Sequence, residues 1–128
     1  MKITATKIFR FEMGHQLDSC VTEECKRPHG HGYSVEVTIA RMQNETNLNN
    51  DGMVLDFKVL KEIISPIIKK YDHQFLTKET CGYNPTAENL ALQIFDGIHS
   101  SKLLQESKCK LVKLKLWETD SANTEIIE

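Results

Sequence analysis

Histidines concentrate near the N-terminus: His15, His29 and His31 are three of the five in the chain. If residues 29–31 are extended, their two imidazoles point the same way from Cα atoms about 6.6 Å apart, so both can meet one ion. His15 continues the apolar face of a preceding predicted strand, which would place it beside them. Three imidazoles with a free fourth position describe a catalytic zinc site. Alternatively, His29 and His31 lie in a surface turn and His15 is a lone core histidine.

Cys25 stands four residues before His29. Its thiolate would be favoured near a divalent cation and could act as a general base or nucleophile. A second interpretation is a closed structural zinc site made of Cys20, Cys25, His29 and His31, although this spacing is not that of a standard zinc finger.

Two carboxylates have positions that suggest function. Asp72 precedes His73 and could set its tautomer and raise its basicity, as an acid–base pair requires. Adjacent side chains on a helix do not face one another, so the pair needs the helix to end there; the alternative is a solvated helix end. Glu118 falls on the apolar face of a predicted strand, where an unpaired carboxylate is costly. It is therefore a candidate ligand anchor, unless it lies beyond the core edge and is simply solvated.

The elements that must position these residues follow from periodicity. Alternation predicts strands over 3–15, 33–39, 110–118 and 124–127, and helical spacing predicts helices over 57–71, capped by Asp56, and 87–98, capped by Thr86. Strands segregated from helices favour an α+β domain, with an antiparallel sheet and both helices on one face. Such a sheet has two open edges, which favours an oligomer.

Composition limits the class of protein. The chain has 128 residues, 40% hydrophobic and 27% charged, with a formal net charge of −2. These values predict one globular domain over 1–128. Near-neutral charge gives no electrostatic reason to expect a nucleic-acid partner or an anionic membrane.

The compartment is predicted from what the N-terminus lacks. Residues 1–7 alternate polar and apolar side chains and do not resemble a signal peptide, and no apolar run approaches the roughly 20 residues that span a bilayer. We therefore expect a cytoplasmic protein in a reducing environment. Its cysteines are then expected as thiols, metal ligands or reactive groups before disulfides, with Cys81 and Cys109 buried or incidental.

Together these segments resemble the pterin synthase family, which includes 6-pyruvoyltetrahydropterin synthase and 6-carboxytetrahydropterin synthase. The resemblance covers nearly the whole chain, and its motifs occur in the family's order. This resemblance strongly disfavours the alternative of a structural zinc site. The matching segments are 9–15, 25–33, 52–61, 72–76, 84–91 and 118–119.

The resemblance implies the tunnelling fold, or T-fold, in which ββααββ subunits join edge to edge as a trimeric barrel and two trimers commonly stack into a hexamer. It also implies a role for each matching residue. His15, His29 and His31 would bind Zn²⁺, and Cys25, Asp72 and His73 would be catalytic. Glu118 would grip the pterin, and Thr86, Ala87 and Glu88 would line its pocket, contributed by a neighbouring subunit.

The reaction depends on which member the chain resembles most. Only Lys26, Arg27 and Pro28 separate Cys25 from His29, which resembles the bacterial carboxy enzyme of queuosine and 7-deazaguanine biosynthesis. That enzyme converts 7,8-dihydroneopterin triphosphate to 6-carboxy-5,6,7,8-tetrahydropterin, acetaldehyde and triphosphate. One alternative is a 6-pyruvoyltetrahydropterin synthase, and a second is a non-catalytic zinc- or pterin-binding assembly protein.

Overall fold

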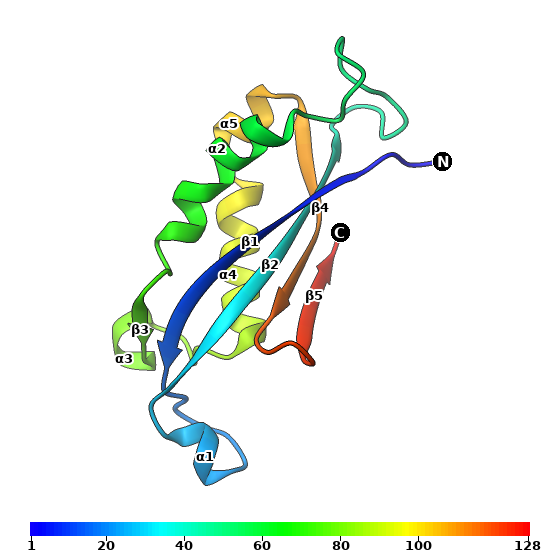
Figure 1. Cartoon of the computed structure of the whole chain (residues 1–128). Helices are drawn as coiled ribbons and strands as arrows, with labels where there is room; N and C mark the ends of the chain where they lie inside the picture. The colour runs from blue at the N-terminus through cyan, green and yellow to red at the C-terminus, as the bar shows by residue number, and fades with distance from the viewer.

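A mixed five-stranded sheet with helices on one face makes up the computed structural model, which describes residues 1–128 (Figure 1). The strand order is β3-β1-β2-β4-β5. Neighbouring strands are antiparallel except β3, which runs parallel to β1. The strands are β1 (Ala5–His15), β2 (His29–Arg41), β3 (Gln74–Leu76), β4 (Cys109–Trp117) and β5 (Asn123–Ile127).

Two long helices, α2 and α4, cover the same face of the sheet (Figure 1). Three short helices lie in the connections between the longer elements. No helix combines the length and apolar character needed to cross a membrane. The helices are α1 (Glu23–Lys26), α2 (Phe57–Lys69), α3 (Lys78–Cys81), α4 (Ala87–His99) and α5 (Lys102–Glu106).

Both predicted helix caps are confirmed. The Asp56 side chain accepts a hydrogen bond from the Lys58 backbone, and the Thr86 side chain accepts one from Asn89. The core forms between the helices and the sheet, because each helix and each strand turns one apolar face toward the other layer. It contains Leu60, Ile64 and Ile68 from α2, Leu90, Ile94 and Ile98 from α4, and Val35, Val37 and Ile39 from β2.

The sheet differs from the purely antiparallel, four-stranded sheet expected from the sequence. The added strand, β3, has only three residues, too few to display an alternating pattern. It pairs with Met13–His15 at the end of β1. The earlier part of β1 therefore has an unpaired edge, and β5 forms the opposite edge.

Two strand boundaries matter for the candidate site. β2 begins at His29, earlier than the predicted residue 33, so both His29 and His31 lie within a strand. β4 ends at Trp117, which leaves Glu118 just beyond it, where its backbone N–H donates to the Ala122 carbonyl. The histidines are thus placed by regular sheet geometry, whereas Glu118 is placed by the turn between β4 and β5.

Candidate active site

Three histidines from paired strands converge on one side of the sheet. His15 is the register partner of His29 in the β1–β2 pair, and His31 lies two residues further along β2. Because side chains alternate along a strand, all three rings occupy the helix-covered face. Their ring centroids lie 4.4 to 5.1 Å apart. The cluster predicted from the His-Gly-His spacing is confirmed as a geometric arrangement.

Backbone carbonyls set the orientation of two of these rings. His15 Nδ1 donates to the Pro85 carbonyl and His29 Nδ1 donates to the Arg27 carbonyl, each at 2.7 Å. Since a carbonyl only accepts, Nδ1 carries the proton, and each neutral ring presents a lone pair at Nε2. The two Nε2 atoms lie 2.8 Å apart. Lone pairs this close repel unless a proton or a cation lies between them.

Glu118 completes the cluster. Its Oε1 lies 2.9 Å from His31 Nε2 and 3.8 Å from His15 Nε2. His31 Nε2 is buried and has no hydrogen-bond partner. Four potential ligand atoms, three nitrogens and one carboxylate oxygen, lie within 4.8 Å of one another. This donor set fits a divalent metal ion.

The electrostatics favour the metal-binding form of the histidines. Burial lowers the pKa of His15 and also that of His31, so both rings tend to be neutral and to keep a lone pair. Burial also raises the pKa of the neighbouring Tyr33, with the Glu118 carboxylate as a second cause. The Tyr33 hydroxyl is buried, has no hydrogen-bond partner and is a functional candidate that the sequence reading missed.

Asp72 and His73 form a pair where the chain leaves α2. The helix ends at Lys69, as the predicted pairing required, and His73 Nδ1 lies 3.0 Å from Asp72 Oδ2. Asp72 Oδ1 accepts a hydrogen bond from the Glu12 backbone N–H, which is the main reason that the pKa of Asp72 lies below its ordinary value. The His73 ring is 79% exposed and thus accessible to a ligand.

The backbone of His73 is held in an unusual conformation. Its φ is +60°, in the left-handed region that non-glycine residues seldom occupy. A hydrogen bond of 2.6 Å from its N–H to the Glu12 carbonyl fixes this conformation against β1. Such local strain is found where surrounding structure imposes it, often at functional sites.

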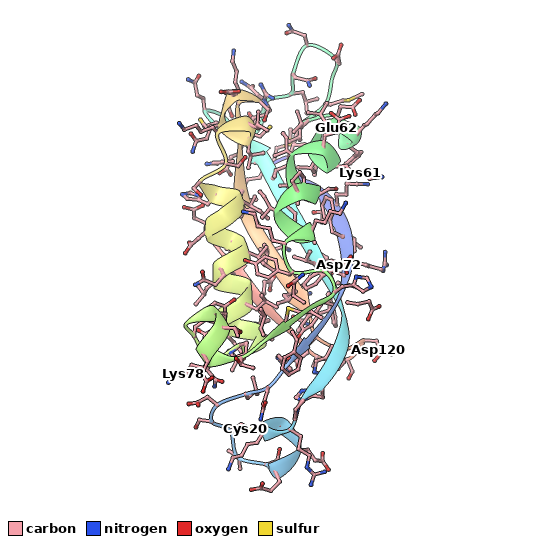
Figure 2. All side chains as sticks on the ribbon, turned by 90° about the vertical axis from the view of Figure 1, so that its left-hand side faces the viewer. Cys20, Lys61, Glu62, Asp72, Lys78 and Asp120 are labelled. Atoms are coloured by element: carbon pink, nitrogen blue, oxygen red, sulfur yellow. A yellow bond between two sulfur atoms is a disulfide. The ribbon has the colours of Figure 1, made fainter.

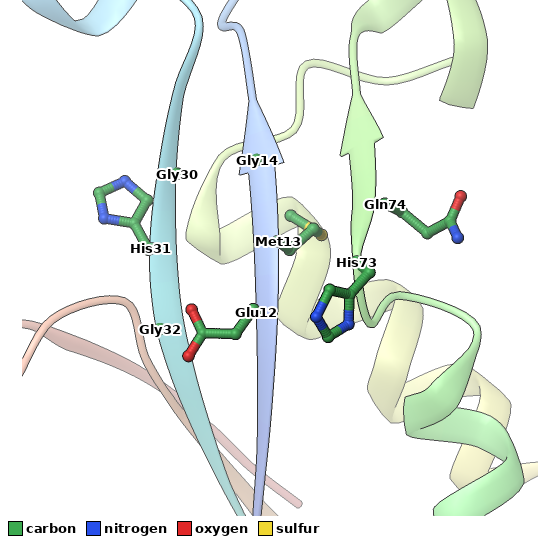
Figure 3. A pocket seen from close by; sticks show the side chains of 8 residues that line it. All are labelled: Glu12, Met13, Gly14, Gly30, His31, Gly32, His73 and Gln74. Carbon is green, nitrogen blue, oxygen red and sulfur yellow. The ribbon is translucent and has the colours of Figure 1, made fainter.

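His73 lines a hollow of about 370 Å³ on the sheet (Figure 3). Glycines open this space: a Cβ on Gly32 would lie 3.2 Å from the Glu12 carboxylate. His31 borders the hollow from β2, but its ring belongs to the histidine cluster on the helix-covered face, whereas Glu12 and Gly32 lie on the opposite face. The hollow is lined by Glu12, Met13, Gly14, Gly30, His31, Gly32, His73 and Gln74.

Cys25 differs from expectation. It was predicted as a thiol, but the structure joins it to Cys20 in a disulfide. The turn of α1 brings the two Cα atoms to 6.3 Å, within the range that a disulfide spans. In this structure Cys20, Cys25, His29 and His31 do not form the alternative closed zinc site, because the two sulfurs bond to each other and the two histidines face His15 and Glu118. Cys81 and Cys109 are free, and Cys109 is buried as expected.

The segment 86–88 begins α4 and contributes no side chain to the cluster within one chain. Thr86 caps the helix, Ala87 packs in the core and Glu88 is exposed. Its neighbour Pro85 contributes instead, through the carbonyl that orients His15. Sequence reasoning missed this contact because a backbone carbonyl has no residue-type signature.

Comparisons with known proteins show which family and which proteins the chain resembles. The family described as 6-pyruvoyl tetrahydropterin synthase matches residues 4–128. A 6-carboxy-5,6,7,8-tetrahydropterin synthase of Synechocystis is 35% identical over 108 residues, covering 77% of this chain and 83% of the relative. A dihydroneopterin monophosphate aldolase of Pyrococcus furiosus is 35% identical over 104 residues, covering 81% and 82%.

Among solved structures, a Caenorhabditis elegans 6-pyruvoyl tetrahydropterin synthase superposes with a TM-score of 0.73. It is 24% identical, with 98% of this chain and 95% of that chain covered. This likeness confirms the α+β tunnelling fold expected from the sequence. The three similar proteins carry three different activities, so similarity alone does not select the reaction.

Proposed function

Since the chain belongs to the 6-pyruvoyl tetrahydropterin synthase family, we propose that it is a zinc-dependent pterin lyase. Its proposed reaction converts 7,8-dihydroneopterin triphosphate to 6-carboxy-5,6,7,8-tetrahydropterin, acetaldehyde and triphosphate, in queuosine or 7-deazaguanine biosynthesis. The observation that carries the proposal is the convergence of three imidazoles and the Glu118 carboxylate, whose ligand atoms lie within 4.8 Å of one another.

His15, His29 and His31 would hold the zinc ion. When bound, zinc supplies a Lewis acid that acidifies coordinated hydroxyls and polarises a carbonyl. The chain prepares the ligands, because the Pro85 and Arg27 carbonyls direct two Nε2 atoms toward one point. Glu118, 28% exposed, retains access to solvent and could accept hydrogen bonds from the N–H edge of a pterin.

Asp72, His73 and reduced Cys25 would move protons during triphosphate loss, internal redox and side-chain cleavage. Asp72 accepts from the Glu12 N–H through one oxygen and contacts the His73 ring through the other, so it orients the imidazole. The exposed His73 ring is free to exchange protons with a ligand in the hollow. In this scheme Thr86, Ala87 and Glu88 line the pterin pocket of a neighbouring subunit.

We further propose a cytoplasmic homo-oligomer, a trimer or a dimer of trimers, with no nucleic-acid or membrane partner. The unpaired part of β1 at one edge and β5 at the other support edge-to-edge association, since open edges favour pairing with another strand. Light scattering of the purified protein measures the assembly directly.

A 6-pyruvoyltetrahydropterin synthase is the main alternative, and a non-catalytic zinc- or pterin-binding assembly protein is the other. The short Cys25–His29 spacing favours the carboxy product over the pyruvoyl product, and the Asp72–His73 pair favours a catalyst over an assembly protein.

Product analysis separates the three functions. Zinc-loaded, reduced protein is incubated with 7,8-dihydroneopterin triphosphate and the products are identified by mass spectrometry. We expect carboxytetrahydropterin with acetaldehyde, and little product from a Cys25→Ala variant that still binds zinc. Pyruvoyltetrahydropterin without acetaldehyde would establish the first alternative, whereas bound zinc without any turnover would favour the second.

A further inference from the structure

We propose that Cys20 and Cys25 form a reversible redox modification site that reacts with low-molecular-weight disulfides such as oxidised glutathione. The proposal depends on the proposed function in one respect: Cys25 is the proton-transferring thiol that the bond would remove. Oxidation would then switch off turnover while leaving the histidine cluster able to bind its metal.

The loop is shaped so that the bond forms without rearrangement of the fold. Thr22 caps the short helix α1, its side chain accepting from the Cys25 backbone N–H. The resulting turn folds Cys25 back toward Cys20, and their Cα atoms lie 6.3 Å apart. That separation lies within the range that a disulfide spans, so the loop accommodates the bond.

Small reagents can reach this bond. Both cysteines are partly exposed, and Val21 between them is fully exposed. Cys20 lies on the α1 loop at one end of the molecule, away from the packed helices (Figure 2). Accessible cysteines exchange with solution disulfides, whereas buried cysteines do not. Cys109, 0% exposed, is of the second kind.

The loop also connects the bond to the candidate site. It runs from His15 to His29, and its Arg27 carbonyl orients the His29 ring. Near the start of the loop, the Asn84 side chain accepts a hydrogen bond from the Asp18 N–H and donates one to the Ser19 carbonyl. The disulfide and the converged histidines coexist in this structure, so bonding the two sulfurs does not disperse the metal ligands.

Oxidised glutathione can form the Cys20–Cys25 bond in two steps of thiol–disulfide exchange. A cysteine thiolate attacks one sulfur of oxidised glutathione, forming a mixed disulfide and releasing one glutathione thiolate. The second cysteine thiolate attacks the protein sulfur of that mixed disulfide, forming the Cys20–Cys25 bond and releasing the other glutathione. The two protons lost by the protein thiols go to the two glutathione thiolates. The protein is oxidised by two electrons and the glutathione disulfide is reduced.

The modification itself is tested without any turnover. The zinc-loaded protein is equilibrated in buffers of varied reduced-to-oxidised glutathione ratio, quenched with N-ethylmaleimide and digested with trypsin. Both cysteines fall in one tryptic peptide, residues 11–26, because no Lys or Arg lies between Phe11 and Lys26. We expect an unalkylated peptide lighter by two hydrogen atoms, which increases with oxidised glutathione and disappears with dithiothreitol.

Its consequence is tested by activity and zinc content in the same buffers. Wild-type turnover should fall about 100-fold or more on full oxidation, the scale of a lost acid–base group, and recover on reduction. Bound zinc should stay constant. Cys20→Ser cannot form the internal bond, so it should lose less turnover than the wild type at the same glutathione ratio, and any loss should coincide with a mixed disulfide between Cys25 and glutathione. Cys81→Ser, which removes a cysteine outside the loop, should respond as the wild type does.

The outcomes distinguish this proposal from the proposed function. If the peptide never becomes oxidised, or resists reduction by dithiothreitol, the reversible site is disproved even though the lyase stands. Full oxidation with unchanged turnover disproves the switch. Reduced wild type without turnover of any neopterin triphosphate disproves the proposed lyase function, while the peptide masses still decide whether the modification site exists.

Discussion

His15 Nδ1 donates a hydrogen bond of 2.7 Å to the carbonyl of Pro85, 70 residues further along the chain. This bond ties the end of β1 to the segment that opens α4. It also fixes which nitrogen of the His15 ring is free, because the protonated Nδ1 leaves Nε2 facing His29. The orientation of a candidate metal ligand thus depends on how the helices dock against the sheet.

Removal of one imidazole should abolish metal retention. We expect His29→Ala to lower zinc affinity by more than the roughly 10- to 100-fold typical of losing an outer hydrogen-bond partner, since a direct ligand is lost. Metal analysis of dialysed protein measures the effect. His73→Asn changes a residue outside the histidine cluster and should bind zinc as the wild type does. Full zinc occupancy in His29→Ala would refute a three-histidine site.

Glu118 should act on substrate affinity rather than on metal binding. Glu118→Ala should raise KM by about 10- to 100-fold, the scale of hydrogen bonds to a charged group, with zinc retained by the three histidines. Steady-state kinetics with parallel metal analysis tests this. Glu118→Gln keeps the side-chain shape and removes the charge, so an intermediate KM is expected. Zinc loss in either variant would instead identify Glu118 as a required ligand.

Two substitutions at His73 should distinguish the effect of the imidazole on activity from the effect of the backbone conformation on stability. His73→Asn removes the imidazole but tolerates the left-handed φ of +60°, so activity should fall by about 10²- to 10⁴-fold with stability little changed. His73→Ala should lose the same activity and also about 1 kcal/mol of unfolding free energy, because alanine is strained there. Urea unfolding of both variants makes the comparison. Equal stabilities would contradict the strain argument.

Glu45 should make stability depend on pH. Its carboxylate lies 2.8 Å from Lys110 Nζ and 3.1 Å from Lys2 Nζ, and hydrogen bonds from these two ammonium groups, Lys110 first, lower the pKa of Glu45. The stabilisation is present above the ordinary glutamate pKa of about 4.3 and is lost as pH falls through the lowered folded value.

Glu45→Gln should therefore be less stable than the wild type near neutral pH and equal to it in strong acid. Urea midpoints across this pH range measure the difference. Glu62→Gln serves as the matched control, since the exposed Glu62 forms no ion pair and should differ little from the wild type at any pH. A constant difference for Glu45→Gln across the range would show that its cause is not the ionised carboxylate.

Local patterns predicted much of this arrangement. Because side-chain direction in a strand has a period of two residues, His15, His29 and His31 share one face once β2 extends back to His29, whereas the predicted strand began only at residue 33. The caps at Asp56 and Thr86 were predicted for a similar reason: capping involves residues only two or three positions apart.

Contacts between distant segments were not predictable in this way. The Pro85 carbonyl contacts His15 only when α4 is packed against the sheet. The three residues of β3 form a strand through their pairing with the end of β1, which no local pattern specifies. The Cys20–Cys25 bond depends on the turn of α1, which a spacing of five residues does not specify. Which subunit's Thr86, Ala87 and Glu88 face a given site stays a prediction.

The pairing of His15 with His29 in the β1–β2 register has a thermodynamic consequence. Strand pairing already closes the loop between these residues, so a metal ion joining them would gain little further loop-closure entropy. The ion would meet ligands that are preorganised by the sheet, unlike a zinc finger, which acquires its fold from the metal. Chelation should accordingly leave the strands and helices folded, and metal affinity should measure ligation itself rather than the ordering of the chain.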